Sequence, residues 1–181
     1  APVTIKSANI SLLHDFQGSR YVVNLVDTPG HVDFSGKVTR SMRAIDGAIV
    51  VVDAVEGVMA QTENVLREAI KERVKPVLFI NKIERLIREL KLPPKQIQER
   101  LTQIIERINN LIAETTDSQI AASWQVSVDS GTVAFGSALH KWGFTVPQIR
   151  RLGLRFIDIL KCYQTNNISK LVDQLPLHTP I

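Results

Sequence analysis

The sequence has one cysteine, Cys162, few aromatic residues (6%) and no apolar run of the roughly 18 residues or more that crossing a membrane takes. A single cysteine excludes an internal disulfide and a cysteine-based zinc site. The first ten residues, APVTIKSANI, do not have the pattern of a signal peptide. We therefore expect a soluble, cytoplasmic protein without a membrane partner.

Apolar residues make up 44% of the 181 residues, which is enough for the core of one domain. Many of them stand in short Val/Ile/Leu runs, and such runs are typical of strands buried on both faces, as in α/β proteins. The net charge of +4 favours polyanionic partners, although an ordinary solvated surface explains it equally well. No basic run with interleaved aromatic residues occurs, so we expect no autonomous DNA binding.

The first half of the chain predicts a hairpin followed by a strand–helix–strand unit. Residues 4–13 partly alternate polar and apolar residues, and 20–27 form a β-branched run. The two segments flank Gly18, which predicts an antiparallel pair. Residues 48–53 and 77–81 are short apolar runs that each end in a polar residue. Apolar residues recur at helical spacing between them, so we expect these two strands to be parallel.

The second half predicts a helical insertion, a further strand and a helical tail. Residues 85–118 have apolar residues three and four apart, and Pro93–Pro94 marks a new helix start. Another apolar run covers 132–137, and residues 155–175 have a helical pattern. The expected organisation is a core of residues 1–84 and 132–175, an inserted helical subdomain at 85–131, and a linker at 176–181.

Three short motifs follow predicted strands. In the first, Asp27-Thr28-Pro29-Gly30-His31, a carboxylate stands at a strand's carboxyl end, where open α/β sheets bind ligands. Asp27 is a candidate magnesium ligand, because Mg²⁺ prefers oxygen ligands and keeps several waters. Gly30 lets the backbone approach a terminal phosphate, and His31 follows where it can orient a water. An ordinary Pro-Gly turn explains this motif alone about as well.

The second motif is Asn81-Lys82-Ile83-Glu84, after the run 77–81. An amide can bond a purine edge, a lysine stem can lie along the ring, and an acidic side chain can accept the two adjacent N–H donors of guanine. The third motif, Ser137-Ala138-Leu139, offers backbone N–H groups for the guanine O6. A solvated helix start is enough to explain the second motif taken alone, and chance is enough to explain the third. Together, however, the three motifs match the order of the GTPase motifs DxxG, NKxD and SAx.

Longer tracts around these motifs resemble the translational GTPases, and in particular the archaeal and eukaryotic elongation factor 2 family. The tracts are DTPGHVDF, VTRSMRAIDGAIVVVDAVEGVMAQTE, VKPVLFINKIERLIRELKL and FGSALHKWGF. The resemblance implies GTP/GDP and Mg²⁺ as ligands, and ribosomal translocation driven by GTP hydrolysis. It further implies that His31 positions the hydrolytic water and that 85–131 contacts the ribosomal stalk. The implied partners are ribosomal RNA and the stalk protein.

The sequence departs from that family in two respects. No GxxxxGK[ST] occurs, although its amides and lysine normally bind the β- and γ-phosphates. Glu84 stands where the family usually has aspartate, which shifts the carboxylate by roughly 1.5 Å. We therefore expect little activity from this chain alone. We interpret the chain as a fragment of a longer protein or as one that another segment completes.

The expected fold is an α/β, P-loop-GTPase-like, mostly parallel sheet with helices on both faces, a helical insertion, and no first strand or phosphate loop. In the family that strand lies between those at 21–26 and 48–53. Two other functions stay open: an inactive remnant that binds the ribosome or its stalk through 85–131, and an adenine-nucleotide enzyme, which Glu84 disfavours. His14, His140 and His178 have no metal-ligand spacing.

Overall fold

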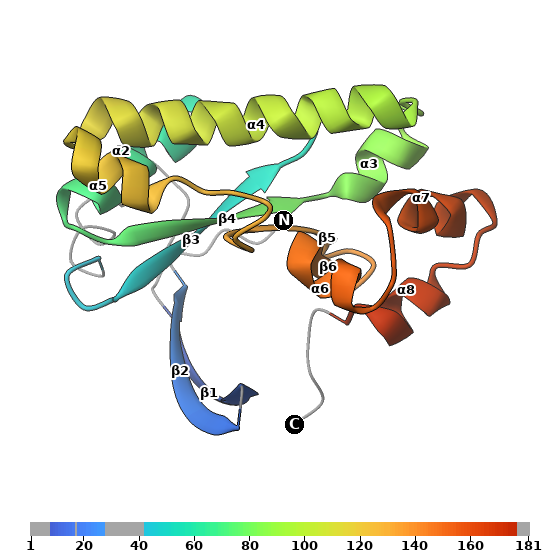
Figure 1. Cartoon of the computed structure of the whole chain (residues 1–181), viewed down its shortest axis with the longest axis horizontal. Coiled ribbons are helices and arrows are strands. Elements are labelled where there is room, and N and C mark those ends of the chain that lie inside the picture. Colours follow the sequence, from blue (N-terminus) through green and yellow to red (C-terminus); the bar gives the residue numbers. More distant parts are fainter. Residues whose placement is uncertain (1–7, 17, 28–41, 177–181) are drawn as a thin grey trace.

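The computed structural model describes residues 8–16, 18–27 and 42–176, which form two separate sheets (Figure 1). The smaller sheet is the antiparallel hairpin of β1 (Ala8–Phe16) and β2 (Ser19–Asp27), with Gly18 at φ 79° in the turn. Glycine adopts this left-handed conformation without strain. The predicted hairpin is confirmed, and it forms a sheet of its own.

The larger sheet has four strands in the order β3-β4-β5-β6. Strands β3 (Gly47–Asp53), β4 (Lys75–Asn81) and β5 (Val133–Ser137) are parallel, and β6 (Trp142–Thr145) is antiparallel to β5. Helix α2 (Ala60–Lys71) connects β3 to β4. The strand–helix–strand prediction and the α/β fold class are therefore confirmed.

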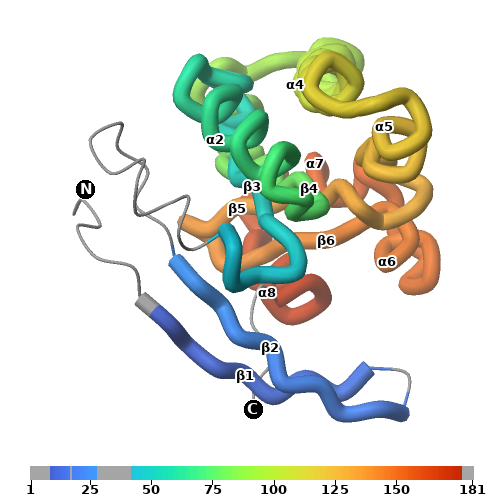
Figure 2. Tube along the Cα trace, turned by 90° about the vertical axis from the view of Figure 1, so that its left-hand side faces the viewer, coloured from blue at the N-terminus to red at the C-terminus, as the bar shows by residue number. Residues whose placement is uncertain are grey.

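Helices lie on both sides of this sheet. Figure 2 shows α2 and α4 (Pro94–Thr115) on one side, and α8 (Ser169–Gln174) and the hairpin on the other. The remaining helices complete the two sides and have the following bounds: α3 Ile83–Arg88, α5 Ser118–Trp124, α6 Val146–Arg151 and α7 Phe156–Gln164. Three of the helices, α3 to α5, stand between β4 and β5, where the sequence predicts a helical insertion.

Helix α4 shows why that segment is helical. Pro93 precedes the helix and Pro94 is its first residue, where a missing N–H costs no hydrogen bond. Its buried residues recur three and four positions apart and pack on the core: Ile97, Leu101, Ile104, Ile108, Leu111 and Ile112. Thr116 is extended and ends the helix, and the Asp117 carboxylate accepts from two amides at the start of α5.

The tail differs from the sequence prediction. The sequence predicts one helical segment over 155–175, but the structure has two helices, α7 and α8, separated at 165–168. Asn166 has φ 53°, and a left-handed residue ends a helix. Strand β6 and helix α6 are not predicted, because the tract 142–151 is too short to show a clear period.

The hairpin and β3 expose much apolar surface. Leu13 is 65% exposed and Val22 63%, while Ile49 and Val51 of β3 are 60% and 56% exposed. In the described part of the chain, β3 has a strand neighbour on one edge only and no strand lies between it and β2. Exposed large apolar side chains therefore gather on the hairpin and on β3.

Candidate functional site

The chemistry-bearing residues meet in a hollow where β4 and β5 end. The hollow has a volume of about 540 Å³. The residues that line it come from the ends of these strands, from α3 and from the turn before β6: Asn81, Lys82, Glu84, Arg85, Arg88, Glu89, Ala138, Leu139 and His140. This is the position, beyond the carboxyl ends of parallel strands, at which open α/β sheets bind ligands. The second and third sequence motifs are thus brought together.

Asn81 joins the two motifs. Its side-chain Oδ1 accepts from the amide of Lys82 at 2.8 Å and from the amide of Ala138 at 2.9 Å. One acceptor therefore fixes the ends of β4 and β5 relative to each other. Because Oδ1 is turned toward the protein, the amide NH₂ group is the part of Asn81 that remains for a ligand.

Lys82 is held in an unusual conformation by its surroundings. Its backbone has φ 64°, in the left-handed region, which costs a non-glycine residue free energy. Its Nζ lies 2.8 Å from Oδ2 of Asp53, which also accepts from Arg85 Nη1 at 3.1 Å. The long side chain of Lys82 therefore runs from the edge of the hollow toward the end of β3.

Asp53 also organises the turn after β3, as its position before a turn suggests. Its Oδ1 accepts from the amides of Val55 at 2.8 Å and Glu56 at 3.3 Å. Burial alone raises the pKa of Asp53, but the hydrogen bonds from Lys82 and from the two amides outweigh it and leave the pKa below its ordinary value. The side chain is therefore a carboxylate at neutral pH.

Glu84 is the most unusual residue of the hollow. It is only 5% exposed, and its Oε2 has no hydrogen-bond partner among the described residues. A buried carboxylate oxygen without a donor is costly, and buried polar groups are nearly always paired. An N–H donor entering the hollow would satisfy this oxygen, so Glu84 points to a ligand that carries such donors.

The loop after β5 forms the opposite wall. Ser137 is fully buried, and its Oγ accepts from the amide of His140 at 3.1 Å. Leu139 is 74% exposed at the hollow. The sequence predicts that backbone amides of this loop bind the guanine O6, but the amides of Ala138 and His140 already donate within the protein, to Asn81 and Ser137.

A polar network behind this loop is not predicted by the sequence. Tyr163 of α7 is 7% exposed, and its hydroxyl lies 2.9 Å from Nε1 of Trp142 and 2.9 Å from Nδ1 of His140. Burial raises the pKa of Tyr163 to about 12, against the opposing effect of hydrogen bonds from Trp142 and Ser137. Its phenol is therefore neutral at physiological pH. No spacing in the sequence relates residue 163 to this loop.

The one described residue of the first motif, Asp27, does not line the hollow. Thr28, Pro29, Gly30 and His31 lie outside the described residues. Asp27 is exposed at the end of β2, opposite Ala8, and does not line the hollow. Among the residues that the structure describes, no three His, Cys, Asp or Glu side chains form a metal-binding group. The assignment of Asp27 to magnesium stays a prediction.

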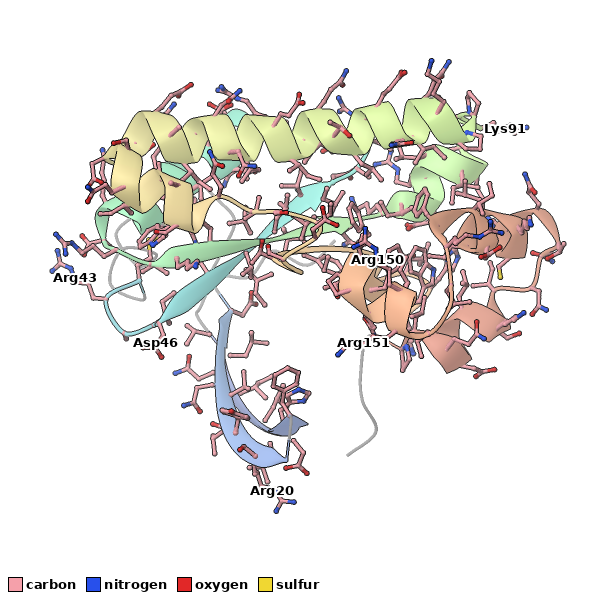
Figure 3. All side chains as sticks on the ribbon, viewed as in Figure 1. Arg20, Arg43, Asp46, Lys91, Arg150 and Arg151 are labelled. Carbon is pink, nitrogen blue, oxygen red and sulfur yellow. The ribbon has the colours of Figure 1, made fainter. Side chains whose placement is uncertain are left out.

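Charged side chains are spread around the rest of the surface. Figure 3 shows Arg20 at the tip of the hairpin, Lys91 near the start of α4 and Arg151 on α6, all pointing away from the core. Arg150 pairs with Asp129 at 2.9 Å on an exposed surface. In the described ranges no helix is long and apolar enough to cross a membrane.

The fold is that of an α/β domain with a hollow at the carboxyl ends of its parallel strands, and comparison with known proteins gives its family. Residues 2–180 match the model of the elongation factor Tu GTP binding domain. The match covers nearly the whole chain, so the chain belongs to that family of GTP-binding domains.

Three similar relatives all have the name elongation factor 2. The chain is 55% identical to the one of Aeropyrum pernix over 178 residues, 97% of this chain and 24% of the relative. It is 55% identical to that of Staphylothermus marinus, over 99% of this chain and 25% of the relative. It is 54% identical to that of Methanocaldococcus jannaschii, over 97% of this chain and 24% of the relative. The chain thus spans about a quarter of the length of the curated relatives it matches, and the resemblance to this family is confirmed.

Proposed function

We propose that this chain is the guanine-recognising part of a translational GTPase. The observation that carries the proposal is the buried, unpaired Oε2 of Glu84 in the hollow formed by the NKIE and SAL motifs. Guanine presents two adjacent donors, N1–H and the N2 amino group, and a carboxylate accepts both. Adenine has an acceptor at N1 and would leave Glu84 unpaired, so a site of this kind rejects it.

Asn81 and Lys82 supply the other contacts with the base. The free NH₂ group of Asn81 suits N7, an acceptor that both purines have, so this contact binds without selecting. The aliphatic stem of Lys82 can lie along one ring face while its Nζ stays paired with Asp53. The exposed Leu139 at the same hollow offers an apolar contact to the other face.

Selectivity for guanine can be tested on the chain itself by saturation-transfer NMR with GDP, IDP and ADP. IDP lacks only the N2 amino group of GDP. We expect GDP to bind better than IDP, and ADP least. Glu84→Gln removes the charge and should abolish the preference for GDP over IDP, whereas Glu84→Asp, the usual family residue, should keep it. Equal saturation by ADP and GDP in the unsubstituted chain would refute the proposal.

We assign the first motif to the phosphate end of the nucleotide. The exposed Asp27 carboxylate at a strand end is the kind of oxygen ligand that Mg²⁺ accepts through water. A bound Mg²⁺ would neutralise phosphate charge. The Thr28-Pro29 turn would bring the backbone N–H of Gly30 to the γ-phosphate, and His31 would orient the attacking water. Without a GxxxxGK[ST] in its sequence, the chain alone should hydrolyse GTP little or not at all.

For the whole protein we propose GTP-driven ribosomal translocation in the cytoplasm. The support is the name of the relatives, elongation factor 2, together with the ordered motifs. Its partners would be ribosomal RNA and the stalk protein, the latter through the subdomain 85–131. The test is GTP turnover of the whole protein with and without ribosomes. Turnover that rises with ribosomes and is lost in His31→Ala supports the proposal, and turnover that ribosomes do not change contradicts it.

A further inference from the structure

Three lysine and arginine side chains line the hollow: Lys82, Arg85 and Arg88. In the described part of the chain, none of them forms an ion pair with Glu84, which lines the same hollow. Two of the three are engaged with Asp53, at 2.8 and 3.1 Å. A buried carboxylate attracts any cation within reach, so the contacts that hold the third cation, Arg88, decide whether Glu84 stays free.

Arg88 is the cation best placed on α3 to reach Glu84. It stands four residues after Glu84, and helical side chains lean back toward the preceding turn. A glutamate followed by a cation at this spacing is the favourable order for a helical ion pair. Instead, Nη2 of Arg88 donates to Oδ1 of Asn166 at 3.1 Å, and its guanidinium carbon lies 5.4 Å from the centre of the Tyr163 ring. Both contacts turn Arg88 toward α7, which packs against α3.

The end of α7 fixes the position of Asn166. Its amide donates to the carbonyl of Tyr163 at 3.3 Å, and the amide of Asn167 donates to the carbonyl of Cys162 at 2.8 Å. With Asn166 at φ 53°, this is the Schellman pattern of a helix that ends on a left-handed residue. Asparagine tolerates this conformation better than most residues, and its side chain here reaches Arg88.

Both charges act on the buried Tyr163. Burial and the charge of Glu84 raise the pKa of Tyr163 to about 12, and the charge of Arg88 opposes them. The carboxylate and the guanidinium therefore both lie near this side chain. A change of side-chain rotamer, without movement of α3, is what would bring Arg88 to Glu84.

We propose that Asn166 is a positioning residue for guanine recognition, which holds Arg88 away from Glu84 and so keeps the carboxylate free for the base. A pair between Arg88 and Glu84 would occupy the oxygens that N1–H and the N2 amino group of guanine need. The apparent affinity for the nucleotide falls in proportion to the fraction of molecules in which Glu84 is free. The inference rests on the proposed function, since it assumes that Glu84 accepts from guanine.

Two substitutions of Asn166 test this role by saturation-transfer NMR titration of the chain with GDP. Asn166→Gly keeps the left-handed backbone and removes the amide that holds Arg88. We expect it to weaken GDP binding by about three- to tenfold, the effect of one exposed hydrogen bond. Asn166→Asp also tolerates the backbone and pairs with Arg88, so it should bind GDP at least about threefold more tightly than Asn166→Gly. Equal affinities of the two variants would overturn the proposal.

The same substitution in a second background separates positioning from a purely structural role. Arg88→Met keeps an apolar stem and removes every donor that can pair with Glu84. In Arg88→Met, the further change Asn166→Gly should alter the affinity for GDP by less than about twofold, because no cation is left to release. A loss of the same size in both backgrounds would mean that Asn166 only stabilises the end of α7, and the proposal would be wrong.

The position of Arg88 can also be measured without any nucleotide. The unsubstituted chain should show nuclear Overhauser effects between the Arg88 δ-protons and the Tyr163 ring, and these should weaken in Asn166→Gly. Unchanged effects in that variant would contradict the role of Asn166.

The outcomes separate this role from the guanine site itself. If the unsubstituted chain prefers GDP to ADP and Asn166→Gly binds GDP as tightly, the role of Asn166 is refuted while the guanine site stands. If the unsubstituted chain does not prefer GDP to ADP, the proposed function fails, and the role of Asn166 fails with it.

Discussion

Asp53 is the residue whose replacement tests the electrostatics of the site most sharply. Its Oδ2 pairs with Lys82 at 2.8 Å and Arg85 at 3.1 Å, and its Oδ1 accepts from the amide of Val55 at 2.8 Å. Asp53→Asn keeps an oxygen for the amide and removes the charge that the two cations face. Asp53→Ala removes the oxygen as well, so the two variants separate the ion pairs from the turn.

The expected loss follows from how far the partners are exposed. The Asp53 side chain is 11% exposed, but those of Lys82 and Arg85 are 48% and 29% exposed, so solvent screens both pairs. We expect Asp53→Asn to lower the free energy of unfolding by about 1–2 kcal/mol. Asp53→Ala should lose about 1 kcal/mol more, the usual value of a side chain that caps backbone amides.

The pH dependence has a definite sign. Because the pKa of Asp53 is below its ordinary value in the folded state, the carboxylate form stabilises the fold. Its contribution is fully present above the unfolded pKa of about 3.9 and is lost as the pH falls through the folded value. The free energies of unfolding of the unsubstituted chain and of Asp53→Asn should therefore differ by a constant gap from about pH 8 to 5. This gap should narrow below about pH 4.

Urea unfolding followed by circular dichroism between about pH 3.5 and 8 measures this gap. Asp129→Asn is the matched control, because its pair with Arg150 is about two-thirds exposed on both sides, 68% and 65%, and should contribute less than about 0.5 kcal/mol. If Asp53→Asn costs no more than Asp129→Asn, or if the gap widens as the pH falls, the ion pairs do not act as described.

Two further predictions concern the core and the strand beside the site. Ile108→Ala, at a fully buried position of α4, should lower the free energy of urea unfolding by about 2–5 kcal/mol. Glu106→Ala, on the exposed face of the same helix, should lower it by less than about 0.5 kcal/mol. Gly136→Ala would place a Cβ 2.6 Å from the Trp142 carbonyl oxygen and 2.8 Å from Phe79 Cζ. We therefore expect it to lower the free energy of unfolding by about 1–3 kcal/mol or more. A melting temperature equal to that of the unsubstituted chain would contradict this close packing.

The site is predictable where its residues directly follow strands. Asn81 and Ser137 end apolar runs, and parallel strands bring such ends to one edge of a sheet. Glu84 and Ala138 follow these strand ends by a few residues, and both line the hollow. The buried, unpaired state of the Glu84 carboxylate is not predictable, because it depends on packing around α3 that no local pattern encodes.

Local sequence patterns do not predict β6 or the role of Tyr163, and the reason is physical. Tyr163 reaches the loop after β5 only because α7 packs behind it, and the contacts join residues 21 and 23 apart in the chain. Strand β6 has four residues, of which Trp142, Gly143 and Phe144 are buried, so it shows no alternation of polar and apolar positions. Tertiary packing, rather than local preference, determines both features.

The most direct test of guanine recognition is calorimetric titration of the chain with GDP, GMP and ADP, with magnesium present. Because the described hollow is the site that we propose for the base, and the sequence has no GxxxxGK[ST], we predict that GDP and GMP bind with similar affinity, weaker than about 10 µM, and that ADP gives no measurable heat. Binding of ADP as tight as that of GDP would contradict the account, since it would mean that Glu84 does not select the base.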